Sequence, residues 1–201
     1  KLFEAAARVF EEQGINGASI ETIAAAAGFT RGAFYSNFKS KEELLAATLA
    51  HLSDQIQLEI RRALAGCRPD DPNARLRAFM VSSLNPDVRQ PEYVKVRFIF
   101  WELASTHPVI RRVHDRIYRR YERQLRAHIR AVALANRSQQ DPALLTTVIM
   151  ALLKGIWVEI SLAKSPLNIQ AIIEQVLALL ESALCGPAPP RRPRARTAEL
   201  V

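Results

Sequence analysis

Three helix-starting residues, Ser19, Thr30 and Ser40, follow one another closely and leave room only for short helices between them. A Ser or Thr at such a position accepts a hydrogen bond from a first-turn backbone N–H that would otherwise lack a partner. Gly28 ends the first of these helices, because glycine readily adopts the left-handed conformation found at helix ends. The pattern predicts two short helices joined by a tight turn, over 20–27 and 30–36.

The rest of the chain also has helical patterns. Apolar residues fall on helical spacing from Leu2 to Phe10, and Gly14 is the expected end of that run. A Ser-x-x-Glu capping box at Ser40 opens a long helix to about Leu64. Five further helices are predicted over 73–84, 91–105, 108–135, 142–163 and 168–184. With only 7 glycines and no strand-like alternation, the chain is predicted to be all-α.

The net charge of +8 suits nucleic-acid binding but does not locate a binding surface. Residues 1–46 hold five Lys and Arg against six acidic residues, so this segment is nearly neutral. The positive excess lies between His107 and Arg130 and in the last fifteen residues. The sequence starts at Lys1, already inside an apparent helix, which leaves room for an upstream basic arm. Motif geometry must therefore locate any DNA contact.

The helix predicted over 30–36 has the features of a DNA recognition helix. Its outer side carries the small residues Gly32, Ala33 and Ser36, which let a helix backbone enter the major groove closely. Thr30 and Arg31, at its N-terminal end, can reach base edges. This geometry favours direct DNA reading by these residues.

The aromatic and basic residues that follow have two interpretations. Phe34 and Phe38 are expected in the core. Tyr35 and Lys39, with the free amides at the Ser40 helix start, suit phosphate contacts. The alternative is that Tyr35 is a core aromatic and Lys39 a solvated charge.

The stretch from Ser19 to Leu44 closely resembles the TetR family of repressors, through its Ala-Gly turn and its run Phe-Tyr-x-x-Phe-Lys-x-Lys-Glu-x-Leu starting at Phe34. The resemblance covers about residues 1–46 and implies a homodimer that reads a pseudo-palindromic operator in double-stranded DNA. It implies that the helix from Ser40 links a DNA-binding domain to a ligand-binding domain. By position it also implies phosphate or groove contacts by Ser19, Thr22, Thr30, Arg31, Gly32, Ala33, Tyr35 and Lys39.

The C-terminal half is more weakly similar to the choline-responsive BetI branch of that family. The similar segments are 98–104 and 151–159. The branch usually has an acidic residue just before the glycine, where this chain has Lys154 followed by Gly155. The resemblance therefore predicts the architecture of this half, and the departure argues against choline itself as the ligand.

Aromatic residues of the C-terminal half form a candidate pocket for a small-molecule effector. Aromatic faces with a carboxylate suit a cation, through cation–π attraction. The candidate residues are Phe98, Trp101, Glu102, Tyr118, Tyr121 and Trp157, with Glu159 nearby in sequence. The alternative is that aromatics at helical spacing simply fill the core.

The helix predicted over 108–135 has two distinct faces. One stripe is apolar and aromatic, from Ile110 through Tyr121 to Val132. Six arginines lie nearly opposite and are interpreted as a solvated face; the alternatives are an anionic ligand such as an acyl-CoA, or a second nucleic-acid surface. Because the two faces point apart, they cannot both line one pocket, which argues against a simple acyl-CoA site.

The last two predicted helices are apolar around more than the stripe that one packed helix needs. Part of this surface is therefore expected to meet a second subunit in a four-helix dimer interface. The predicted organisation is a three-helix helix-turn-helix domain, a helical ligand-binding and dimerisation domain, and a disordered basic Pro/Arg tail, over 1–46, 47–185 and 186–201.

Other classes of protein have less support. Neither the four histidines nor Cys67 and Cys185 have metal-ligand spacing, and no G-x-S-x-G or P-loop motif occurs, so we expect neither metal, cofactor nor enzyme. Lys154 and Glu159 interrupt the most apolar stretch, and no signal peptide opens the sequence, so we expect a cytoplasmic protein without membrane contact. A ligand-free DNA-binding dimer is the second hypothesis and an all-α enzyme the third.

Overall fold

The computed structural model describes residues 2–83, 91–163, 165 and 167–185. Within these residues the chain is all-α, as predicted, and no strand occurs. The helices are α1 (Leu2–Gly17), α2 (Ile20–Ala27), α3 (Arg31–Tyr35), α4 (Lys41–Ala65), α5 (Pro72–Ser82), α6 (Pro91–Leu103), α7 (Pro108–Ala135), α8 (Pro142–Leu162) and α9 (Ile169–Cys185). The predicted tail, 186–201, lies outside the described residues.

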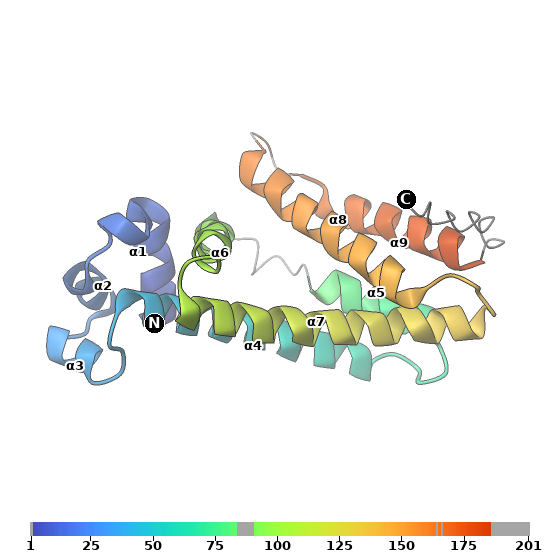
Figure 1. The fold of residues 1–201 in the computed structure, drawn as a ribbon, viewed down its shortest axis with the longest axis horizontal. Helices are drawn as coiled ribbons and strands as arrows, with labels where there is room; N and C mark the ends of the chain where they lie inside the picture. Colours follow the sequence, from blue (N-terminus) through green and yellow to red (C-terminus); the bar gives the residue numbers. More distant parts are fainter. Residues whose placement is uncertain (1, 84–90, 164, 166, 186–201) are drawn as a thin grey trace, which may run out of the picture.

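Helices α1, α2 and α3 form a small domain at one end of the molecule (Figure 1). Its core contains Phe10, Ile23 and Phe34, each at most 1% exposed. The predicted caps are present: Ser19 Oγ accepts from the Thr22 N–H at 3.0 Å, and Thr30 Oγ1 accepts from the Ala33 N–H at 3.2 Å. These local hydrogen bonds fix where the two short helices begin.

Two glycines in this domain have left-handed backbone. Gly28 ends α2 with φ 73°, as predicted. Gly14 also has positive φ, 65°, with ψ 175°, so the regular helix from Leu2 ends there, as predicted. After this kink a further helical turn runs to Gly17, and the Ala18 N–H donates to the Gly14 carbonyl at 3.1 Å. The extra turn carries the chain toward the start of α2.

At the start of α4 one hydrogen bond of the capping box forms as expected, and the other is shifted by one residue. Ser40 Oγ accepts from the Glu43 N–H at 3.2 Å, as the Ser-x-x-Glu pattern predicts. The Glu43 carboxylate accepts from the Lys39 N–H at 2.7 Å, one residue before the cap itself. The Lys41 ammonium donates to the Ala18 carbonyl at 3.3 Å, so the first turn of α4 is tied to the α1–α2 connection.

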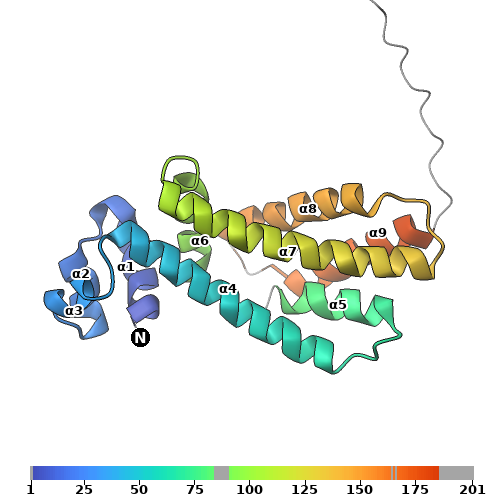
Figure 2. The same ribbon diagram turned by 60° about the horizontal axis from the view of Figure 1, so that its bottom comes forward.

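Helices α4 and α7 pack against each other and spread apart toward the far end of α4, where α5 lies between them (Figure 2). Polar side chains join them at mid-length: the Arg120 guanidinium donates to Ser53 Oγ at 2.7 Å and to Asp54 at 3.0 Å. One turn further on, Gln124 Nε2 donates to Gln57 Oε1 at 2.8 Å. These contacts set the register between the helix that leaves the small domain and the longest helix of the body.

The remaining helices surround this pair. Helix α5 packs on α4, α7 and α9, while α8 packs on α7. Helix α6 packs against α1 and also touches α4, α7 and α8, so it lies between the small domain and the body (Figure 1). On α7 the six arginines of the predicted basic face, Arg112, Arg116, Arg119, Arg123, Arg126 and Arg130, are all exposed.

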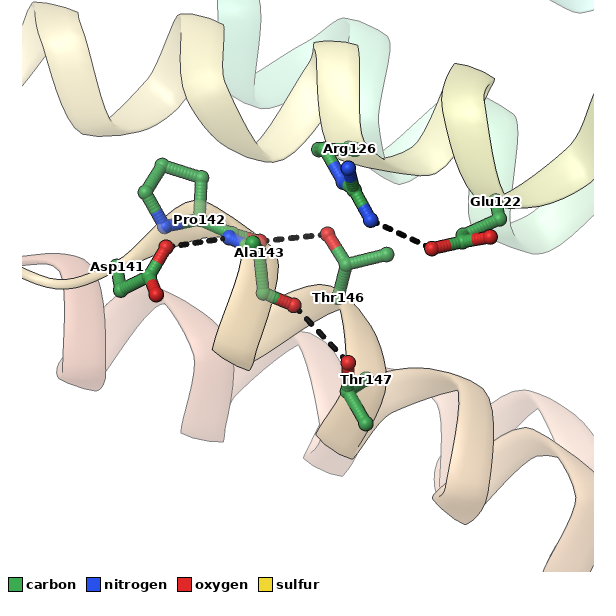
Figure 3. A network of polar contacts seen from close by, with 7 residues as sticks. All are labelled: Glu122, Arg126, Asp141, Pro142, Ala143, Thr146 and Thr147. Atoms are coloured by element: carbon green, nitrogen blue, oxygen red, sulfur yellow. Dashed lines mark hydrogen bonds and ion pairs between the residues drawn. The ribbon is translucent and has the colours of Figure 1, made fainter. Parts of the chain in front are cut away.

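Helix α8 starts beside α7 with a hydrogen-bonded cap (Figure 3). The Ala143 N–H donates to Asp141 Oδ1 at 2.8 Å, and Pro142 occupies the first helical position, as predicted. Thr146 Oγ1 donates back to the Pro142 carbonyl at 2.6 Å. Across from it, Arg126 of α7 pairs with Glu122 of its own helix. The arginine therefore completes a pair within α7 rather than bridging to α8.

By length and composition alone, α8 could cross a membrane, with a mean hydropathy of 1.8. The expectation that Lys154 and Glu159 interrupt it too strongly is wrong on this measure, because the residues around these two charges are strongly apolar. A core helix of a soluble protein passes the same test, so this is weak evidence for a membrane span. The apolar character extends beyond the face that α8 buries.

Candidate DNA-binding surface and effector cavity

The outer side of α3 is exposed at the end of the molecule. Thr30, Arg31, Gly32 and Tyr35 are all exposed, whereas Phe34 between them is 1% exposed and anchors the helix. The expected division between core and outer residues in this helix is therefore present. Tyr35, whose alternative interpretation was a core aromatic, is 47% exposed.

Arg31 is held by two neighbours in the small domain. Its Nε lies 3.1 Å from Oε1 of Glu21 on α2, and both side chains are more than half exposed. Its guanidinium carbon lies 5.6 Å from the centre of the Tyr35 ring. The charged group is thus positioned over the start of α3 and stays accessible to solvent.

Gly32 is not required by packing inside the protein. A Cβ added there would meet only Thr30 Oγ1, at 3.9 Å, and the backbone lies outside the left-handed region. Its neighbour Ala33 is partly buried. The small size of Gly32 therefore affects only what can approach α3 from outside.

The other predicted DNA contacts lie on the same end of the molecule. Ser19 and Thr22 are partly buried and their hydroxyls lie 2.7 Å apart, so each already has a hydrogen-bond partner. The Lys39 side chain is exposed, while its backbone N–H is taken by Glu43. The side chain of Lys39, rather than its amide, is therefore the group free to meet a phosphate.

A cavity of about 130 Å³ lies in the helical body. Side chains of α4, α6, α7 and α8 line it, and Ser83 contributes from the end of α5. Most of the lining is apolar, including Leu52, Phe100 and Met150. A mostly apolar cavity with a few polar groups is the usual form of a small-molecule site.

Four of the six residues predicted for the pocket line this cavity: Trp101, Tyr118, Tyr121 and Trp157. Phe98 and Glu102 are not among the lining residues, and Glu102 is exposed. On α6 the lining residues are Arg97, Phe100 and Trp101. The predicted residues of α6 have the same spacing as the lining residues but lie one position later in the sequence. One position corresponds to a rotation of about 100° around the helix axis.

Sequence reasoning missed Arg97 as a cavity residue. Its guanidinium carbon lies 4.2 Å from the centre of the Trp157 ring, and its buried Nε has no hydrogen-bond partner. Burial lowers the pKa of Arg97 to about 10, so it is still charged at neutral pH. Its position directly between the apolar residues Val96 and Phe98 was the signal that could have identified it.

Lys154 supplies a second positive charge to the cavity. Its Nζ lies 4.6 Å from the centre of the Tyr118 ring, and His114 stacks on the same tyrosine with ring centres 5.7 Å apart. The residue is exposed, so it lies where the cavity meets solvent. An anionic ligand was not expected from the two opposite faces of α7, but Arg97 and Lys154 line the cavity from α6 and α8.

Tyr121 is fixed by a hydrogen bond within the lining. Its Oη lies 2.8 Å from Ser83 Oγ, and its ring packs on Phe79 with centres 5.0 Å apart. Burial raises the pKa of Tyr121 to about 12, so the phenol is neutral. It offers a ligand a hydroxyl and not a charge.

No group of three or more potential metal ligands occurs among the described residues. Cys67 and Cys185 are both free thiols.

A helix-turn-helix with an exposed second helix, joined to a helical body that contains a cavity, defines the class of DNA-binding regulators with a separate second domain.

Comparison with known proteins agrees with this class. The family model for bacterial regulatory proteins of the tetR family matches residues 2–48, and the model for the C-terminal domain of BetI-type transcriptional repressors matches residues 72–184. The chain therefore belongs to the TetR family of transcriptional regulators, with a BetI-type C-terminal domain, and is not an enzyme.

The chain is also similar to individual curated proteins, and solved structures share its fold. The chain is 27% identical over 175 residues to the regulator BetI of Burkholderia cenocepacia, covering 87% of each chain. A putative transcriptional regulator from Pseudomonas aeruginosa PAO1 has a TM-score of 0.81 at 24% identity, covering 92% of this chain and 89% of its own. A putative regulator from Saccharomonospora viridis, solved in complex with choline, has a TM-score of 0.76 at 21% identity, with 90% and 93% covered.

Proposed function

We propose that this protein is a cytoplasmic, homodimeric repressor that binds a pseudo-palindromic operator and is released from DNA by a small molecule. Residues 1–46 are the DNA-binding domain and 47–185 bind the effector and dimerise. The proposed DNA contacts are the eight residues expected from the sequence, from Ser19 to Lys39. The observation that carries this proposal is the exposed outer face of α3, where Arg31 and Gly32 meet solvent above a buried Phe34.

The apolar outer face of α8 and α9 supports a dimer. Leu144, Val148 and Leu152 recur every four residues on α8 and are each more than 40% exposed. Gly155, three residues after Leu152, lies on the same helix face, and nothing lies within 4 Å of a Cβ placed on it. On α9, Leu179 is 65% exposed. Two copies that pair these helices would form a four-helix interface, with room at Gly155 for close helix approach.

Two helices connect the cavity to the DNA-binding domain. Helix α4 carries Leu52 and Gln57 into the cavity and is fixed to the small domain through Lys41. Helix α6 carries Arg97 and Trp101 into the cavity and packs on α1, where Lys95 pairs with Glu11 at 3.9 Å. A ligand that favours a different placement of either helix would change the separation of the two recognition helices.

The test measures operator release. Purified protein is titrated onto DNA flanking its own gene in a gel-shift assay, with and without a panel of quaternary amines, carboxylates and acyl-CoAs. The proposal expects specific, salt-sensitive binding that one class of compound abolishes. Specific binding that no compound affects would favour the ligand-free dimer. Absence of specific binding would contradict the proposal as a whole.

A further inference from the structure

The charged side chains that line the cavity are basic. They are Arg97 from α6 and Lys154 from α8, and the imidazole of His114 from α7 also lines the cavity. No Asp or Glu is among the described lining residues. Asp115 lies next to His114 and pairs with it at 3.1 Å, but it does not line the cavity. A ligand entering this space therefore meets positive charge without a compensating carboxylate.

Two of the aromatic rings that would attract a cationic ligand, those of Trp157 and Tyr118, already face cations of the chain itself. Arg97 lies over Trp157 and Lys154 lies over Tyr118. A quaternary ammonium bound against these rings would have to displace the two side chains or lie beside them, and like charges in a poorly hydrated site repel. Two of the aromatic residues that suggest a cation site in the sequence therefore already have a cationic partner within the protein.

Arg97 has unused hydrogen-bonding capacity. Its buried Nε has no hydrogen-bond partner, and no ion pair joins it to an acidic side chain among the described residues. A buried charged donor without a partner is costly, and an oxyanion would satisfy it. The guanidinium also presents two donors in the fork that fits a carboxylate.

We propose that the effector of this regulator is a compact organic anion, an apolar body with one carboxylate-like group that Arg97 and Lys154 bind. This inference rests on the proposed function and specifies the ligand of the same cavity. The apolar body would lie against Leu52, Phe100 and Met150. A cavity of about 130 Å³ is close to the size that encloses one benzene ring, so the body is small.

The test uses intrinsic fluorescence of the intact protein. Its 2 tryptophans, Trp101 and Trp157, both line the cavity, so a change in emission reports occupancy there. The probes are matched pairs with one skeleton and opposite charge: benzoate with benzylamine, 3-phenylpropionate with 3-phenylpropylamine, and hexanoate with hexylamine. Choline is added as a further cation. We expect at least one carboxylate to bind at least tenfold more tightly than its amine.

Variants assign this preference to the cavity. Arg97→Gln should abolish it, and Arg97→Lys should retain part of it. Arg116→Gln removes an exposed arginine from the outer face of α7 and is the matched control, expected to behave as wild type. If Arg97→Gln fails to fold, as judged by circular dichroism, Lys154→Gln decides the question and should reduce the preference at least threefold.

The outcomes separate the two proposals because binding is measured without DNA. Amines or choline binding more tightly than the carboxylates would overturn the anionic assignment, as would the absence of saturable carboxylate binding. Release of DNA by an amine would agree with the proposed function and would contradict the inference that the effector is an anion. Carboxylate binding that leaves the DNA complex unchanged would support the anion site and contradict effector release.

Discussion

Glu21 on α2 holds Arg31 on α3, with Oε1 and Nε 3.1 Å apart. An acidic residue thus lies next to the arginine that we place in the DNA groove, where it also repels phosphates. Glu21→Gln should therefore strengthen binding to non-specific DNA severalfold at low salt. Anisotropy titrations on a random duplex at two salt concentrations measure this. Weaker non-specific binding by the variant would mean that Glu21 orients Arg31 productively.

A substitution at Gly32 should affect DNA binding much more than it affects the stability of the fold. Because its surroundings are open, Gly32→Leu should change the free energy of unfolding by no more than about 1 kcal/mol, the range of helix propensities. The added side chain would stand between α3 and the groove floor and should weaken operator binding at least tenfold, about 1.4 kcal/mol. Urea unfolding and gel shifts measure the two effects. Unchanged DNA affinity would exclude this face of α3 from the groove.

Val148 tests the proposed dimer interface. A charge at this position, Val148→Asp, would be buried without a partner when two copies of α8 meet, and should raise the dimer dissociation constant at least tenfold. Leu58→Asp, on the exposed side of α4, is the matched control because Leu58 is 40% and Val148 48% exposed in one chain. Sedimentation velocity over a concentration series distinguishes them. Equal dissociation of both variants would argue for a different interface.

His128 predicts how stability depends on pH. Burial lowers the pKa of His128 from its ordinary 6.5, so the folded protein binds this proton less readily than the unfolded chain. Its neutral form therefore favours folding above pH 6.5, and stability falls as the pH drops through 6.5 toward the lower folded value. His128→Gln should show a smaller loss of stability between pH 7 and 5.5 in urea unfolding. A loss as large as that of wild type would contradict this assignment.

The DNA-binding end was predictable because its signals are local. Ser19, Thr30 and Ser40 bond to amides within three residues of themselves, so sequence spacing alone is enough to place three helix starts. Gly14 ends the regular part of α1 as expected, but the helical turn that follows it to Gly17 was not predicted. Local patterns give helix starts better than they give the path between helices.

The cavity was less predictable because five helical segments build it. Trp101 and Trp157 were predicted for the pocket and line the cavity, but their neighbours there depend on how α6 is rotated against α8. Rotating α6 by one residue position brings Arg97 and Phe100 into the cavity in place of Phe98 and Glu102. The expected charge of the ligand then changes from positive to negative. Packing between distant helices therefore decides the chemistry of the site.

Selection of DNA from the source genome tests the central claim most directly. Fragmented genomic DNA is incubated with the wild-type protein, and the bound fragments are sequenced beside those bound by Arg31→Ala. The account predicts strong enrichment of a few fragments that share a two-fold symmetric sequence, with that enrichment lost in the variant while its thermal stability is unchanged. Enrichment without a common symmetric sequence, or equal enrichment by Arg31→Ala, would contradict operator reading by α3.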